Sequence, residues 1–198
     1  MVEHRVINVD KFQIREENGE RYLDGYYSVF NQPYEVYPGW VEEIAPGAFS
    51  RFLREGKDVK VLWNHNSDIV LGSTQNRTAQ LLEDEHGLHG PVKINEDDQD
   101  AKNAFARVNR GDVRGCSFGF DIRAMEESWD EDGTYRTRLT DIELYEVSPC
   151  TFPAYAQTNI SARAKENLED ARERYKEAQE RKKEEWQTKM KKRLKGEK

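Results

Sequence analysis

The distribution of charge along the 198-residue chain constrains its fold most, because it divides the chain into two unequal parts. Residues 164–198 hold 13 basic and 9 acidic side chains among 35 positions. A segment this polar cannot bury a hydrophobic core of its own, although its Glu, Lys, Arg and Ala content favours helix. We therefore expect residues 1–163 to form the folded domain and residues 164–198 to form a charged helical or disordered tail.

The charge of residues 1–163 also limits the function of the chain. This part carries 18 basic and 29 acidic side chains, a net charge of −11, so no basic field is available for binding nucleic acid. No apolar run approaches the roughly 20 residues that cross a bilayer, and the first residues lack a secretory signal pattern. With only Cys116 and Cys150, we expect no disulfide framework and a reducing cytoplasm.

Strand patterns outnumber helix patterns in residues 1–163. One short helix is expected between Pro46-Gly47 and Gly56, and a second between Asp97 or Asp98 and Gly111. Because no regular βαβ alternation appears, the pattern predicts a mainly β, α+β fold, a small closed or nearly closed β-barrel flanked by helices. The expected strands cover residues 22–30, 40–44, 59–63, 78–82, 88–94, 113–122 and 139–147.

The tail has an interrupted apolar stripe. Leu168, Ala171, Tyr175 and Ala178 follow a 3-4 spacing, and the stripe resumes out of step in a second group, Trp186, Met190 and Leu194. Two heptads are too few to indicate a coiled coil. A solvated helix supported by Glu and Lys pairs is therefore the first interpretation, and a partner-binding helix is the second.

Ser117 is the first candidate for chemistry. If residues 116–120 form a strand, Cys116, Phe118 and Phe120 point to one face, whereas Ser117 and Gly119 point to the other. The aromatic face suits the core, and a glycine in a strand often marks the close approach of a ligand or of another backbone. From spacing alone, a polar residue on a solvated face is the simpler interpretation of Ser117.

His65 is the second candidate, because it lies where the apolar run Val61-Leu-Trp63 meets a polar turn. A side chain there is positioned by a rigid strand yet remains open to a cleft. Imidazole is the usual general base for a serine hydroxyl, since its ordinary pKa of about 6.5 lets it take and return a proton near neutrality. For this residue alone, a hydrogen-bonded surface histidine is the simpler interpretation.

Glu146 is the third candidate, since a carboxylate that orients the imidazole completes the chemistry of a serine hydrolase. Asp141 and Glu143 compete for the same role, and spacing does not separate the three. The simpler interpretation of Glu146 is a glutamate on a face of the barrel, paired with Arg136 or Arg138.

A metal site and a thiol nucleophile are weaker hypotheses. His86 and His89 stand near acidic residues, but Gly87 between them indicates a hairpin turn rather than a shared helical face. Cys116 should face the core beside Phe118, where a thiol is usually inert. We expect neither a metal nor a cofactor.

Several ordered segments together resemble the prohead proteases of HK97-like tailed bacteriophages, from about Tyr22 to Arg163. The resemblance rests on their order and spacing along the chain. The segments are Gly25-Tyr-Tyr-Ser-Val-Phe30, Glu43-Ile-Ala-Pro-Gly-Ala-Phe49, Val61-Leu-Trp-Asn-His65, Arg107-Val-Asn-Arg-Gly-Asp-Val-Arg-Gly115 with Cys116-Ser-Phe-Gly-Phe120, and Glu143-Leu-Tyr-Glu-Val-Ser-Pro149 with Thr151-Phe-Pro-Ala154.

The resemblance implies a β-barrel similar to the herpesvirus assembly protease over residues 1–163. It implies Ser117 as nucleophile, His65 as general base and an acidic third member, placed at Glu146, with Glu143 and Asp141 as alternatives. Cys116 departs mildly from the family, where Met or another apolar residue is common. The polar segment 126–137 is expected to be a variable loop.

The resemblance further implies a serine endopeptidase that acts inside the assembling procapsid in the host cytoplasm. Its partner would be the major capsid protein, whose scaffolding segment it would cleave, and it would also cut itself, with the tail as a candidate for removal. Self-association is a further expectation, because herpesvirus relatives act as dimers. A catalytically silent assembly or scaffolding protein with the same fold is the alternative, and a metal-dependent hydrolase using His86 and His89 is a more distant one.

Overall fold

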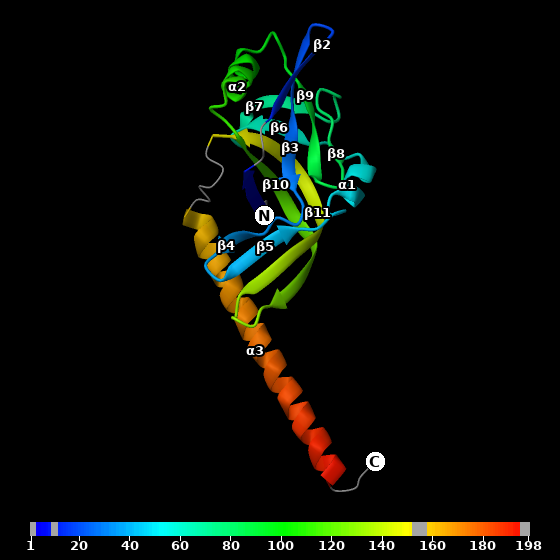
Figure 1. Cartoon of the computed structure of the whole chain (residues 1–198), viewed down its shortest axis with the longest axis vertical. Coiled ribbons are helices and arrows are strands. Elements are labelled where there is room, and N and C mark those ends of the chain that lie inside the picture. The colour runs from blue at the N-terminus through cyan, green and yellow to red at the C-terminus, as the bar shows by residue number, and fades with distance from the viewer. Residues whose placement is uncertain (1–2, 9–11, 152–157, 195–198) are drawn as a thin grey trace.

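The computed structural model describes the backbone of residues 3–8, 12–151 and 158–194 and the side chains of residues 12–151 and 164–191. Residues 152–154 of the last resembling motif, the side chain of Leu194 and residues 195–198 of the tail lie outside these ranges. The strands (Figure 1) are β1 Glu3–Asn8, β2 Gln13–Glu17, β3 Glu20–Val29, β4 Tyr34–Tyr37, β5 Trp40–Ile44, β6 Lys60–Trp63, β7 Asn66–Ser73, β8 Leu82–Glu83, β9 Gly87–Lys93, β10 Gly115–Trp129 and β11 Tyr135–Cys150. The helices are α1 Ser50–Glu55, α2 Gln99–Arg110 and α3 Thr158–Leu194.

The described strands form two sheets around the long β10–β11 hairpin. One sheet has the order β1-β10-β11-β5-β4, with β6 also paired to β11 and β7 paired to β6. The other has the order β2-β3-β9-β8. The predicted α+β, mainly β class is confirmed.

No closed barrel is found among the described strands, unlike the predicted one. The strand β11 pairs in parallel with β5 along its first residues and with β6 along its last ones. Because β5 and β6 share one edge of β11, the sheet branches there instead of closing, and β3 and β9 pair in a separate sheet. The likeness to the herpesvirus assembly protease stays a prediction.

The core contains the aromatic face of β10. Phe118 and Phe120 are fully buried with ring centroids 4.9 Å apart, and the Phe118 ring meets the Phe49 ring edge-on at 5.9 Å. This is the face predicted from the alternation of residues 116–120. Because Phe118 and Phe120 face the core, Ser117, which precedes Phe118, points to the opposite side of the sheet.

Both predicted helices are confirmed, and their ends follow from local chemistry. The Asp98 side chain accepts a hydrogen bond from the Asp100 N–H at 2.9 Å, which caps α2. Gly111 ends α2 and Gly56 ends α1, each with positive φ, a conformation that glycine adopts without a steric penalty. Both helices are short, and they bury their apolar faces in the main core.

Two other local predictions are wrong. The polar segment 126–137 forms the distal part of the β10–β11 hairpin, in which Glu126 lies opposite Arg138 and Trp129 opposite Tyr135. Opposite charges and aromatic pairs across the two strands stabilise this part of the hairpin. Composition alone does not reveal such pairs. Residues 78–82 do not form the predicted strand, since only Leu82 enters β8 and Ala79 makes an isolated bridge to Val92.

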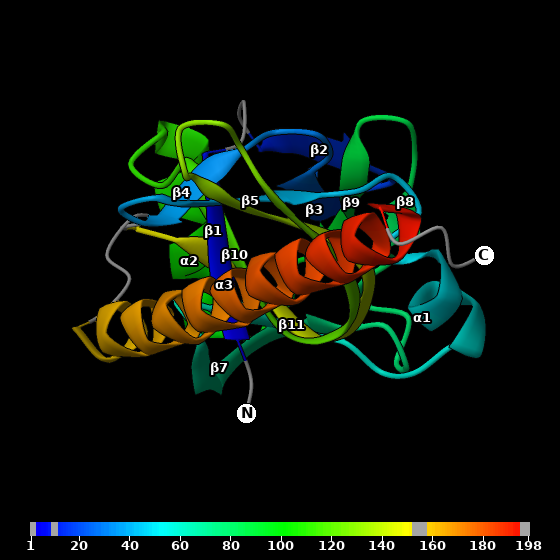
Figure 2. The same cartoon turned by 90° about the horizontal axis from the view of Figure 1, so that it is seen from below.

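The tail forms the helix α3, which begins before the predicted boundary at residue 164. Ala164, Leu168 and Ala171 are buried in a second cluster with Trp40 and Tyr135. Beyond this contact the helix extends away from the sheets (Figure 1), and the view from below shows it in front of them (Figure 2). Among the described residues, none of the helices has both the length and the apolar character that a membrane span requires.

Candidate active site

His65 lies in the two-residue turn that joins β6 to β7. Its φ is +60° and that of Asn64 is +53°. Two consecutive positive φ values are typical of a type I′ hairpin turn, whose second position favours glycine. A histidine at this position costs backbone strain, and such strain is maintained where the side chain is needed for something else.

The end of β11 holds this turn in place. The Asn64 N–H donates to the Pro149 carbonyl at 3.1 Å. The Asn64 side-chain amide donates to the Thr151 hydroxyl at 3.2 Å, and its Oδ1 accepts from the Thr151 N–H at 2.8 Å. The His65 N–H donates to the Ser148 hydroxyl at 3.2 Å. The strained backbone at His65 is therefore fixed by several hydrogen bonds from one neighbouring strand.

Glu146 contacts the imidazole directly. Its Oε1 lies 2.6 Å from His65 Nδ1, and its Oε2 accepts a hydrogen bond of 2.6 Å from the Ser148 hydroxyl. The Glu146 side chain is only 10% exposed, whereas the His65 side chain is 29% exposed. With Glu146 ionised, the contact holds a proton on Nδ1 and leaves Nε2 as an acceptor.

Ser117 lies on the strand beside Glu146. In the antiparallel β10–β11 ladder, Ser117 is opposite Ser148 and Gly119 is opposite Glu146. Residues opposite each other project to the same face of a sheet, as do residues two apart in a strand. Ser117, Ser148 and Glu146 therefore belong to one face, opposite to the Phe118 face. Ser117 has no exposed surface, so its interpretation as a residue on a solvated face is wrong.

The competing carboxylates have other partners. Asp141 accepts hydrogen bonds of 3.0 and 2.8 Å from Arg51 Nε. Glu143 pairs with Arg123 and with Lys57, and the hydrogen bond from Arg123 lowers the pKa of Glu143 the most. Of the three candidate acids, the structure brings Glu146 to His65.

Arg136 and Arg138, the arginine partners predicted for Glu146, pair with other acidic residues. Arg136 pairs with Asp130 at 2.6 Å and Arg138 with Glu43 at 3.1 Å. The interpretation of Glu146 as a glutamate paired with one of these arginines is therefore wrong.

The two cysteines offer no competing nucleophile. Cys116 and Cys150 are buried free thiols. Burial raises the pKa of Cys116 well above its ordinary value and raises that of Cys150 to about 12. A thiol with a raised pKa stays protonated near neutrality and reacts slowly.

His86 lies in the β8–β9 turn, as predicted, and His89 lies within β9. The His86 ring packs edge-on against the Tyr26 ring at 4.5 Å, and His89 Nε2 lies 3.5 Å from an Asp84 oxygen. In the part of the chain that the structure describes, no three metal-binding side chains gather at one point.

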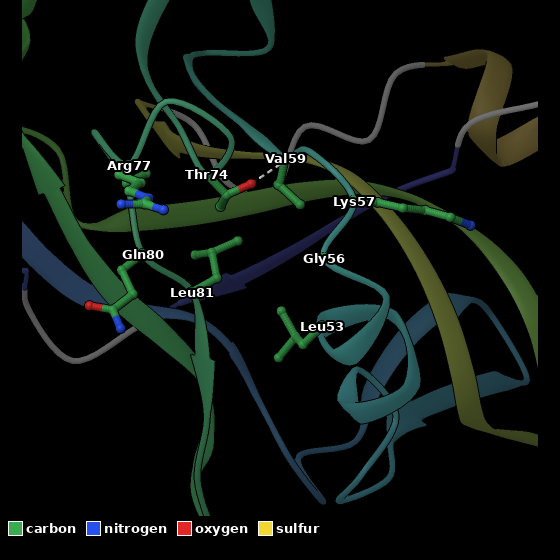
Figure 3. Close-up of a pocket in the computed structure, with 9 residues that line it drawn as sticks. Leu53, Gly56, Lys57, Val59, Thr74, Arg77, Gln80 and Leu81 are labelled. Carbon is green, nitrogen blue, oxygen red and sulfur yellow. Dashed lines mark hydrogen bonds between the residues drawn. The ribbon is translucent and has the colours of Figure 1, made fainter.

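A groove of about 440 Å³ lies between α1 and the segment that follows β7. Figure 3 shows Leu53, Val59 and Leu81 turned toward its interior, whereas the Lys57 side chain extends away. Val59 immediately precedes β6, whose far end carries the His65 turn. The groove is therefore separated from the His65–Glu146 contact by the length of that strand.

Comparisons with known proteins place the chain among phage prohead proteases by sequence. The sequence model described as caudovirus prohead serine protease matches residues 10–173. The prohead protease of Enterobacteria phage HK97 is 29% identical over 153 residues, which are 76% of this chain and 64% of the HK97 protein. The structure of the bacteriophage T4 capsid assembly protease aligns with a TM-score of 0.47 and 8% identity over 77% of this chain and 98% of that chain.

Proposed function

Since this chain belongs to the caudovirus prohead serine protease family, we propose that it is a serine endopeptidase that cleaves the scaffolding segment of the phage major capsid protein during procapsid maturation. It also cuts itself, and it acts inside the procapsid in the host cytoplasm. The chain spans 64% of the length of the HK97 relative. The family, and not the geometry of the site, supports the proposed substrate and location.

In the proposed mechanism, His65 Nε2 removes the proton from the Ser117 hydroxyl as its oxygen attacks the peptide carbonyl. The imidazolium then returns this proton to the leaving amine, and an acyl-enzyme remains on Ser117. Water, deprotonated by the same imidazole, hydrolyses the ester and restores the hydroxyl. Glu146 holds the ring orientation and stabilises the imidazolium in both halves of the cycle.

The 2.6 Å contact between His65 Nδ1 and Glu146 Oε1 supports this proposal most. A nearly buried carboxylate is costly unless it is paired, and here the partner is a histidine in a strained turn. Ser117 occupies the neighbouring strand on the face that carries Glu146. These positions match the base and orienting acid of a serine hydrolase.

The complete burial of Ser117 favours the alternative, a catalytically silent assembly protein. A substrate carbonyl cannot reach a hydroxyl without exposed surface, so cleavage requires local opening around β10. In this alternative, the chain keeps the fold and binds capsid subunits but cleaves no peptide bond.

Co-expression with the major capsid protein of the same phage separates the two functions. The wild-type chain should shorten the capsid protein, as seen by intact mass, and Ser117→Ala should leave it at full length. Equal shortening by both variants would remove Ser117 from the nucleophile role. Full-length capsid protein with both variants, under conditions in which procapsids form, would favour the silent assembly protein.

A further inference from the structure

Ser148 contacts two residues of the candidate site, Glu146 and His65. Its hydroxyl donates to Glu146 Oε2 at 2.6 Å and accepts from the His65 N–H at 3.2 Å. Glu146 Oε1 also contacts the His65 ring, so each of the three residues Ser148, Glu146 and His65 contacts the other two. The same residue lies opposite Ser117 in the β10–β11 ladder.

We propose that Ser148 is a positioning residue of the peptidase, which acts through Glu146 and the His65 turn and not on the substrate. This inference rests on the proposed function of the site. A carboxylate held at one oxygen by an imidazole can still rotate about its last bond. The hydrogen bond from Ser148 to the second oxygen removes that freedom and directs Oε1 at Nδ1.

The hydroxyl also supports the strained backbone at His65. With φ of +60°, this residue sits where a turn favours glycine, and its N–H must find a partner. Ser148 supplies the acceptor, so one side chain fixes both the carboxylate and the backbone of the base. An alanine at position 148 would leave both groups without this partner.

A second buried serine provides a matched control. Ser28 is as completely buried as Ser148, but its hydroxyl has no hydrogen-bond partner among the described residues. Ser28→Ala therefore removes the same atom from a site of equal burial without disturbing a polar network. Any effect of deleting a buried hydroxyl as such will appear in both variants.

The test measures the rate at which a fluorophosphonate probe forms a covalent adduct with Ser117, followed by intact mass. Wild type should label and Ser117→Ala should not. A hydrogen bond to a charged group supports an expected slowing of about 10- to 100-fold for Ser148→Ala, with Ser28→Ala at the wild-type rate. Ser148→Cys should be as slow as Ser148→Ala, because it keeps the side-chain size but is a poor donor.

The coupling between Ser148 and Glu146 distinguishes positioning from packing. In a Glu146→Ala background, adding Ser148→Ala should slow labelling by less than about 3-fold, because residues that act as a unit are not additive. An equally large deficit in both backgrounds would overturn the positioning role, and so would a wild-type rate in Ser148→Cys. If wild type does not label, or Ser117→Ala labels equally, the proposed function itself fails.

Discussion

His65 and Glu146 are 81 positions apart in the sequence, yet Nδ1 and Oε1 lie 2.6 Å from each other. The parallel pairing of β6 with the end of β11 brings them together, because the turn after β6 is hydrogen-bonded to Ser148 and Pro149. The contact thus depends on backbone pairing as much as on the two side chains.

The three candidate carboxylates should separate in a mutant series. Glu146→Gln should lower the rate of capsid-protein cleavage by about 10²–10⁴-fold without unfolding the chain, because the imidazole loses the group that stabilises its charged form. Asp141→Asn and Glu143→Gln should cleave at close to the wild-type rate, since Arg51 and Arg123 are their partners. A large loss of cleavage rate in Glu143→Gln with a small one in Glu146→Gln would contradict the assignment of Glu146 as the orienting acid.

The strained turn predicts a difference between two inactive variants. His65→Ala and His65→Gly both delete the imidazole and should both abolish cleavage. At a φ of +60°, however, alanine keeps the steric penalty that glycine lacks. His65→Gly should therefore exceed His65→Ala in free energy of unfolding by about 1 kcal/mol, measured in urea. Equal stabilities would show that the turn relaxes when the side chain is lost.

The residues that the sequence predicted best belong to regular, local patterns. The alternation over 116–120 placed Phe118 in the core, and the spacing of apolar residues before Gly111 defined α2. The sequence also singled out Ser117, His65 and Glu146, but it could not choose among three acids. That choice depends on which strand end meets the β6 turn, a long-range pairing that local periodicity does not contain.

Other features were missed for the same reason. Ser148 stands two positions after Glu146, so alternation alone places both on one face, but its contact with His65 requires the parallel β6–β11 pairing. The branching of the sheet at β11 likewise depends on pairing partners. The distal part of the β10–β11 hairpin was not predicted because most of its residues are polar and exposed. Of its residues, Trp129 and Tyr135 are the two whose rings pack against each other across the strands.

The edge strand β1 should control access to Ser117. In the β1–β10 ladder Val6 is opposite Ser117, β1 has no second neighbour among the described strands, and it precedes the matched range 10–173. An edge strand that pairs on one side only is among the elements that open locally most readily. A chain lacking residues 1–9 should label faster with a fluorophosphonate than the full chain.

The control for this truncation is a Ser117→Ala version of the same shortened chain, which should form no adduct. Circular dichroism should show that the strand content outside β1 is retained. A folded truncated chain that labels at the full-length rate would mean that another segment limits access to Ser117.

Asp58 should make the stability of the β6–β7 region dependent on pH. Burial tends to raise its pKa, but hydrogen bonds from Lys60, Ser73 and the Gln75 N–H outweigh burial and lower the pKa. A carboxyl with a lowered pKa in the folded state stabilises the fold above its unfolded pKa of about 3.9, and this contribution is lost as the pH falls through the folded value.

Asp58→Asn should therefore cost on the order of 2 kcal/mol of unfolding free energy at pH 7. The difference from wild type should shrink as the pH falls below about 4. Urea titrations at several pH values measure it, and Asp68→Asn, whose carboxyl has no ion pair among the described residues, is the control. A difference that is constant with pH would exclude the carboxylate charge as its cause.

The docking of α3 on the sheets should depend on Leu168 and not on the exposed residues farther along the helix. Leu168 is 1% exposed in the cluster with Trp40 and Tyr135, whereas Trp186 is 61% exposed. Leu168→Ala should weaken the docked state by about 2–5 kcal/mol, and Trp186→Ala should leave it within about 0.5 kcal/mol. Proteolysis with trypsin reports the difference, because the many Lys and Arg residues of α3 become cleavable when the helix undocks. Equal protection of the helix segment near Leu168 in both variants would show that α3 is held by contacts other than this cluster.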